Sequence, residues 1–169
     1  MDQQGRQRHA RDGRRFGLRR GWLRHLLAEQ AGTVPETLRF AVGDQGKPFL
    51  PDYPDLHFSL SHSGGIALAA IGGAALGCDI EACDPATADP LVAGRLFSAA
   101  ERAMLAPLSG AAWTAAFFDI WVRKEAYVKA IGTGLSTPLQ SVCVTHIPGW
   151  RIEGVAAPAG FAGAVALPG

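Results

Sequence analysis

Lysine is scarce in this chain of 169 residues, which contains three lysines against thirteen arginines. The three are Lys47, Lys124 and Lys129. Each falls in one of the polar motifs described below. A lysine kept against so strong a preference for arginine indicates a position that needs a compact amine rather than a planar guanidinium. Chance placement is the alternative.

Cysteine is also scarce, and the three cysteines at positions 78, 83 and 143 have no spacing typical of a metal site. We interpret them as reduced, apolar residues and expect a cytoplasmic protein. No apolar run approaches the roughly 20 residues of a transmembrane helix, so no membrane association is expected. The arginine-rich start lacks the apolar region and the cleavage site of a secretory signal.

Charged residues make up only 18% of the chain and the net charge is +1, whereas 48% hydrophobic residues suffice for a core. The charge is unevenly distributed, because eight arginines lie between Arg6 and Arg24. A basic N-terminal helix indicates an anionic partner: a phosphate, a nucleic acid or an acidic protein. For most of these arginines a solvated surface is an equal alternative, and Arg15 is the candidate that faces a ligand.

The hydrophobic pattern predicts a chain that alternates between helices and groups of strands. Helices are expected at 10–31, 90–97 and 111–131, with a capping box at Ser98 and Glu101, and strands at 36–42, 57–61, 66–71, 75–81, 141–145, 150–153 and 163–167. This order predicts an α+β fold with two similar halves, 1–74 and 75–169, and a cleft between them.

One stripe of the predicted helix 111–131 carries Trp121, Glu125 and Lys129, which share a face because they lie four residues apart. An acid and an amine beside a bulky aromatic on a stripe facing the core indicate a ligand, a metal or a partner charge. The alternative is an ordinary solvated ion pair on a helix surface.

Two carboxylates, Asp79 and Glu81, point to the same face of the predicted strand 75–81 because side chains alternate along a strand. Like charges on one face repel unless a cation or solvent screens them. A hard cation such as Mg²⁺ suits two or three carboxylates together with phosphate oxygens. An exposed strand end is the alternative.

Two turn-rich segments offer donors for a phosphate. The segment 61–65 supplies Ser61, His62 and two glycines at a strand end, and Lys47 lies between Gly46 and Pro48 on a loop. Plain turns are the alternative in both places. A serine nucleophile activated by His62 is disfavoured because the chain lacks a G-x-S-x-G motif.

Four motifs in this order resemble the 4′-phosphopantetheinyl transferases of the Sfp type, in the holo-carrier-protein synthase superfamily. They are G-K-P at 46–48, F-S-L-S-H-S-G at 58–64, G-C-D-I-E at 77–81 and W-V-R-K-E-A-Y-V-K at 121–129. The resemblance covers about residues 8–144. It implies a pseudo-twofold α+β fold, each half having a long helix against a small antiparallel sheet, which binds coenzyme A and Mg²⁺ between the halves.

The resemblance also implies roles for individual residues. The implied metal ligands are Asp79, Glu81 and Glu125. The residues implied to hold the nucleotide end and 3′-phosphate of coenzyme A are Lys47, Ser61, His62 and Arg15. The residues implied to lie beside the pyrophosphate are Lys124 and Lys129.

The implied reaction transfers phosphopantetheine from coenzyme A to a serine hydroxyl of an apo acyl or peptidyl carrier protein and releases 3′,5′-ADP. Such a transfer needs a cation on the pyrophosphate, a base for the incoming hydroxyl and charge stabilisation at the leaving oxygen. We expect Glu125 to be the base and Lys129 to stabilise the leaving oxygen. We expect a monomer, because a chain with two similar halves completes its own cleft.

Members of this family usually begin with a further N-terminal strand, whereas this chain begins almost at the first helix, so an edge strand is expected to be missing. This departure favours one alternative, an inactive or truncated relative that binds coenzyme A or carrier protein without turnover. A nucleic-acid-binding module based on the arginine-rich helix is a second alternative. It predicts strongly salt-dependent binding, but it leaves the three carboxylates unexplained, so we do not expect a nucleic-acid partner.

Overall fold

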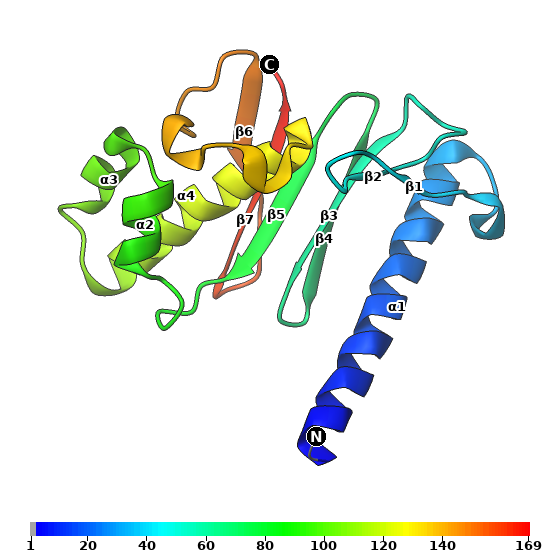
Figure 1. The fold of residues 1–169 in the computed structure, drawn as a ribbon, viewed down its shortest axis with the longest axis horizontal. Helices are drawn as coiled ribbons and strands as arrows, with labels where there is room; N and C mark the ends of the chain where they lie inside the picture. Colours follow the sequence, from blue (N-terminus) through cyan, green and yellow to red (C-terminus); the bar gives the residue numbers. More distant parts are fainter. Residues whose placement is uncertain (1–2) are drawn as a thin grey trace.

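A computed structural model describes residues 3–169, and the side chains of residues 17–169 except that of Leu135 (Figure 1). The first half begins with a long helix, α1 (Gln3–Ala31), which ends at Gly32 in the left-handed conformation (φ 65°). A short turn of helix, η1 (Pro35–Thr37), precedes two hairpins. The hairpins pair β1 (Ala41–Val42) with β2 (Pro48–Phe49) and β3 (His57–Ser63) with β4 (Ile66–Gly72).

The last turns of α1 hold the first half together. Leu23 and Leu27 of α1 are buried against Phe58 of β3 and Leu50 of the loop before it. These side chains recur at helical spacing on α1, which is why one face of this helix is apolar at its C-terminal end. The rest of α1 extends away from the hairpins towards the N-terminus (Figure 1).

The prediction of a strand over 36–42 was wrong for most of its length. Only Ala41 and Val42 pair in a ladder, and the segment starts as the η1 turn at Pro35. The guanidinium of Arg24 donates hydrogen bonds to the carbonyl oxygens of Pro35 (2.6 Å) and Leu38 (2.7 Å). A side chain from α1 therefore satisfies backbone groups that a neighbouring strand would otherwise have to satisfy.

The second half has a three-stranded antiparallel sheet in the order β5–β7–β6. Its elements in chain order are β5 (Gly77–Ala82), α2 (Pro90–Leu96), α3 (Ala99–Leu105), α4 (Gly110–Ile131), η2 (Gly134–Ser136), η3 (Leu139–Ser141), β6 (Trp150–Gly154) and β7 (Phe161–Pro168). The capping box of Ser98 and Glu101 is confirmed at the start of α3.

Small residues let α4 lie directly on this sheet. Ala126 and Ala130 of α4 pack against Ala164 and Ala166 of β7, and all four are at most 3% exposed. The approach is closest at Gly77, where an added Cβ atom would lie 2.0 Å from the carbonyl oxygen of Ala126. Glycine at this position in β5 therefore fixes how near α4 comes to the sheet.

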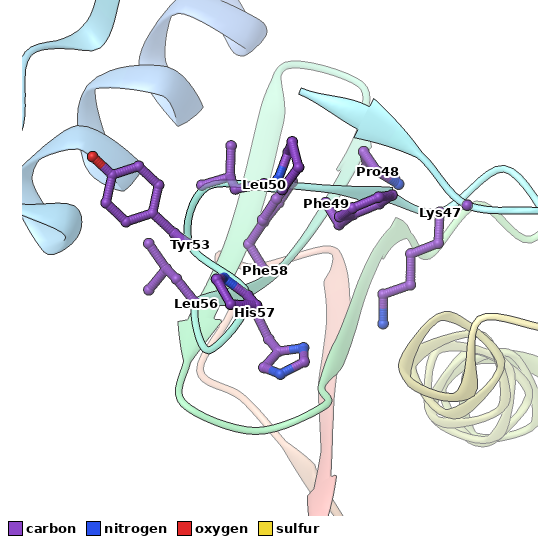
Figure 2. Close-up of a pocket in the computed structure, with 11 residues that line it drawn as sticks. Lys47, Pro48, Phe49, Leu50, Tyr53, Leu56, His57 and Phe58 are labelled. Atoms are coloured by element: carbon purple, nitrogen blue, oxygen red, sulfur yellow. The ribbon is translucent and has the colours of Figure 1, made fainter. Parts of the chain in front are cut away.

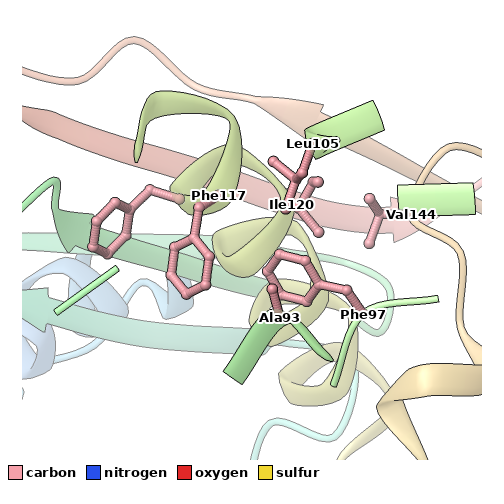
Figure 3. Packing of buried hydrophobic residues seen from close by; sticks show 7 residues of the cluster. Ala93, Phe97, Leu105, Phe117, Ile120 and Val144 are labelled. Carbon is pink, nitrogen blue, oxygen red and sulfur yellow. The ribbon is translucent and has the colours of Figure 1, made fainter. Parts of the chain in front are cut away.

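Aromatic packing joins α4 to the two short helices. Phe97, which follows α2, has its ring centroid 5.2 Å from that of Phe117 on α4. Leu105 of α3 and Ile120 of α4 belong to the same buried cluster, with Val144 from the segment after α4 (Figure 3). This cluster is the core of the second half outside the sheet.

The prediction of a strand over 141–145 was wrong. The segment forms the η3 turn followed by irregular chain, and the described strands of this half are β5, β6 and β7. The other predicted helices and strands are present with shifted ends. The predicted helix 111–131 corresponds to α4.

Serine side chains connect the two halves where β3 runs beside β5. The two strands belong to different sheets, yet Ser59 Oγ accepts a hydrogen bond from the amide of Cys78 (3.1 Å) and Ser63 Oγ accepts one from the amide of Ala82 (2.9 Å). The hydroxyls thus take the place that carbonyl groups have in a continuous sheet.

The structure confirms the α+β class with small antiparallel sheets. The first half packs its long helix on a two-stranded hairpin, whereas the second packs one on three strands. A pseudo-twofold relation between halves 1–74 and 75–169 stays a prediction. Among the residues described, no helix is both long and apolar enough to span a membrane.

Candidate active site

A cleft of about 750 Å³ receives side chains from both halves of the chain. The first half contributes Arg20 of α1 and Lys47 of the loop between β1 and β2. The second half contributes Trp121, Glu125 and Lys129 of α4, the predicted stripe of that helix. The stripe therefore faces a shared cleft rather than a solvated helix surface.

Asp79 of β5 has an unusual environment for a carboxylate, because it is only 2% exposed. Its Oδ1 atom accepts hydrogen bonds from Ser61 Oγ and from Lys129 Nζ, both at 2.6 Å. Its Oδ2 atom is buried and has no hydrogen-bond partner among the residues that the structure describes. A buried carboxylate oxygen without a partner is costly, so this atom indicates a position for a further ligand.

Glu81 and Glu125 bring two more carboxylates towards Asp79. Glu81 Oε2 accepts a hydrogen bond from Ser63 Oγ at 2.7 Å. Burial raises the pKa of Glu125, and the negative charges of Asp79 and Glu81 raise it further, while Lys129 opposes the shift. The charges of the two strand acids thus act on the carboxylate of the helix acid.

Whether this donor set suits a metal ion can be judged from its chemistry. Among residues with described side chains, no three histidine, cysteine, aspartate or glutamate side chains are grouped closely enough to form a metal site as they stand. The set nevertheless has oxygen donors, mutual repulsion of acids and the unpartnered Oδ2 of Asp79. These are properties that a hard divalent cation complements.

Lys47 connects the loop between β1 and β2 to the second half. Its ammonium donates hydrogen bonds to the carbonyl oxygens of Leu76 and Ala130, each at 2.9 Å. Burial lowers the pKa of Lys47. The side chain extends towards the end of α4 and away from Tyr53, beside a second cavity of about 490 Å³ that is lined by the 43–58 segment (Figure 2).

The other residues predicted to bind coenzyme A differ in their exposure and in the direction of their side chains. Ser61 is buried and bonds to Asp79. His62 is exposed and lies on the opposite face of β3, because side chains alternate along a strand. The predicted side chain of Arg15 lies outside the described residues.

Lys124 does not lie in the cleft, which corrects its implied position beside the pyrophosphate. Its side chain is 0% exposed, and its ammonium lies 2.8 Å from Glu101 Oε2. It also donates to the carbonyl oxygens of Leu139 and Val142. The amine is thus held by groups of the protein itself and is not available to a ligand in the cleft.

Sequence reasoning missed three contributors to this region. Ser59 and Ser63 flank Ser61 at every second position, and all three face β5. The strand period could have identified them, because S-x-S-x-S puts its hydroxyls on one face. Glu101 was recognised as a cap, but its bond to Lys124 joins positions distant in the chain and has no local signal.

Comparison with known proteins identifies the family. A sequence profile of the 4′-phosphopantetheinyl transferase superfamily matches residues 75–162, just over half of the chain. The chain belongs to this superfamily. The matched region contains Asp79, Glu81, Glu125 and Lys129. The predicted site residues of the first half lie before this region.

Individual transferases of the superfamily match a longer stretch. The chain is 35% identical over 136 residues to the 4′-phosphopantetheinyl transferase Sfp of Bacillus subtilis, covering 80% of this chain and 60% of that protein. It is 32% identical over 152 residues to HetI of Nostoc, covering 82% and 64%. It is 40% identical over 120 residues to AcpT of Salmonella typhi, covering 69% and 61%. The chain thus spans about three fifths of the length of these transferases.

Proposed function

We propose that this protein is a 4′-phosphopantetheinyl transferase that moves phosphopantetheine from coenzyme A to a serine hydroxyl of an apo carrier protein. One observation carries the proposal. The buried Asp79 pairs with Lys129, and Lys129 and Glu125 line the cleft that receives side chains from both halves; all three residues lie inside the region that matches the superfamily. Acids and an amine at one point of a cleft suit transfer of a phosphoryl group.

Asp79, Glu81 and Glu125 would hold Mg²⁺. When bound, the ion would supply positive charge to the pyrophosphate oxygens of coenzyme A. The residues of the chain bind and orient the substrates on either side of that charge. Ser61 and Ser63 orient the carboxylates of Asp79 and Glu81 through hydrogen bonds of 2.6 and 2.7 Å.

Glu125 accepts the proton of the incoming serine hydroxyl in the proposed reaction. Burial and the neighbouring acids raise the pKa of Glu125, which makes its carboxylate a stronger base. The serine oxygen forms a bond to the β-phosphorus of coenzyme A, and the bond from that phosphorus to the bridging oxygen breaks. Lys129 stabilises the charge that develops on the departing 3′,5′-ADP.

Other residues bind the rest of coenzyme A. Lys47, Ser61 and His62, with Arg15, hold the nucleotide end in this proposal, and of the first half's residues Lys47 and Arg20 line the cleft. For Lys47 and Ser61 this requires a change of partner or a shared hydrogen bond, because both already bond within the protein. A pseudo-twofold relation between the halves, a monomeric state and a cytoplasmic location complete the proposal.

The test is a mass measurement on a carrier protein. The protein is mixed with coenzyme A, Mg²⁺ and apo acyl or peptidyl carrier proteins, and a gain of one phosphopantetheine is expected. Glu125→Gln should abolish the gain, whereas Asp119→Asn, which changes an exposed acid of the same helix, should keep it. Coenzyme A binding without a mass gain on several carriers would instead favour an inactive relative.

A further inference from the structure

Lys124 and Glu101 form an ion pair in the interior of the second half. The side chains are both 0% exposed, and they join α4 to α3 across 2.8 Å. Removing two charges from water is expensive, and such a pair persists only where further hydrogen bonds satisfy both partners. The position of those further bonds therefore indicates what the pair does.

Three of the additional bonds go to one short stretch of backbone. Lys124 Nζ donates to the carbonyl oxygens of Leu139 (2.8 Å) and Val142 (2.5 Å). Glu101 Oε1 accepts from the amide of Val144 (2.9 Å). This stretch, 139–144, overlaps the segment 141–145 that was wrongly predicted as a strand, and side chains from two helices bond to backbone groups there.

The cleft wall includes the first residue of this stretch and the segment just before it. Gly134, Thr137 and Leu139 line the cleft, as does Glu125, which follows Lys124 in the sequence. Lys124 is not among the described residues that line it. The pair thus lies behind the wall, with one of its members on the helix that carries the proposed base.

We propose that Lys124 and Glu101 are positioning residues that hold the segment 137–144 in place, and with it the part of the cleft wall formed by Thr137 and Leu139. Neither contacts a ligand. The proposal explains why a fully buried lysine occurs next to Glu125. It relies on the proposed function only for the identity of the ligand, because the backbone bonds are present in the protein alone.

Hydrogen exchange without any ligand is the first test. In Lys124→Met the segment loses the ammonium that donates two hydrogen bonds to its carbonyl oxygens, so the amides of residues 139–144 should exchange about tenfold faster or more. The matched control is Leu105→Ala, which removes an apolar side chain from the same core and leaves the pair intact. If both variants increase exchange in 139–144 equally, the pair only stabilises the fold and the proposal is overturned.

A double variant distinguishes the cost of leaving a buried charge unpaired from the loss of the hydrogen bonds to the segment 139–144. Lys124→Met leaves Glu101 buried without its cation, whereas Lys124→Met with Glu101→Leu buries no charge. Replacing both members of a buried pair by apolar residues commonly restores stability. We expect the melting temperature of the double variant to exceed that of Lys124→Met while exchange in 139–144 stays fast. Slow exchange in the double variant would overturn the proposal, since the segment would then need neither residue.

Coenzyme A binding, measured by calorimetry at several salt concentrations, distinguishes positioning from direct contact. Lys124→Met should weaken binding about tenfold or more but keep the wild-type salt dependence, because the ammonium does not face the phosphates. A flatter salt dependence in Lys124→Met would show a direct phosphate contact and overturn the proposal. If the wild-type protein binds no coenzyme A, the proposed function fails, and the exchange experiments still decide the role of the pair.

Discussion

Lys129 Nζ lies 2.6 Å from Asp79 Oδ1, although the two residues are 50 positions apart in the chain. One comes from the helix that crosses the second sheet and the other from the first strand of that sheet. Ser61, from the first half, bonds to both of them, at 3.0 Å from Lys129 Nζ and 2.6 Å from Asp79 Oδ1. These three hydrogen bonds join the two halves at the point where the proposed chemistry occurs.

Lys129→Met should destabilise the fold through Asp79. The carboxylate is 3% exposed and would lose its charged donor, at a cost of about 1–3 kcal/mol in the free energy of unfolding. Urea denaturation measures this change. Arg151→Met is the control, because its ion pair with Glu153 is exposed and should contribute less than about 1 kcal/mol. Equal losses in both variants would contradict a special role for the Asp79 contact.

Loss of either glutamate should weaken metal binding. Glu81→Gln and Glu125→Gln each remove one of the acids proposed to hold the ion with Asp79, so Mg²⁺ should raise the melting temperature less than in the wild type. Asp119→Asn removes an exposed acid from α4 and should keep the wild-type shift. A shift that is equal in all of the variants would place the ion elsewhere.

The helical period predicted which α4 residues face the cleft. The same period also indicates that Lys124 does not face it. Adjacent residues of a helix point about 100° apart, so a stripe through Trp121, Glu125 and Lys129 leaves Lys124 on another face. The resemblance based on four motifs nevertheless implied that Lys124 lies beside the pyrophosphate, whereas the structure shows its ammonium buried and paired with Glu101.

Strand predictions failed where side chains, rather than neighbouring strands, satisfy the backbone. The stretch 141–145 reads as a strand because valines alternate with small polar residues. Its amide and carbonyl groups instead bond to Glu101 and Lys124, which are distant in the chain. A local sequence pattern carries no information on such distant partners. For the same reason, the strand period could show that the three serines of β3 share a face, but not which residues of the other half they bond to.

Gly77→Ala should disrupt the packing of α4 on the sheet. The new Cβ atom would lie 2.0 Å from the carbonyl oxygen of Ala126 and 2.3 Å from the amide nitrogen of Ala130, and helix backbone cannot yield as a flexible side chain can. We expect a loss of about 3 kcal/mol or more in the free energy of unfolding. Gly73→Ala is the control, because a Cβ atom there meets nothing within 4 Å. Similar stability of the two variants would contradict the close approach.

Lys47 should give the protein a stability that rises with alkaline pH. Burial lowers its pKa below the ordinary 10.5, with the thiol of Cys78 opposing the shift. Between the folded and the unfolded pKa, the unfolded chain holds a proton that the folded chain has released, so this residue's contribution to stability increases as the pH rises through that window. Lys47→Met has no such proton and should lack the contribution. The difference in unfolding free energy between wild type and variant, measured by urea denaturation at a series of alkaline pH values up to the ordinary 10.5, should therefore shift in favour of the wild type as the pH rises. A difference that stays constant over this range would mean that Lys47 titrates alike in both states.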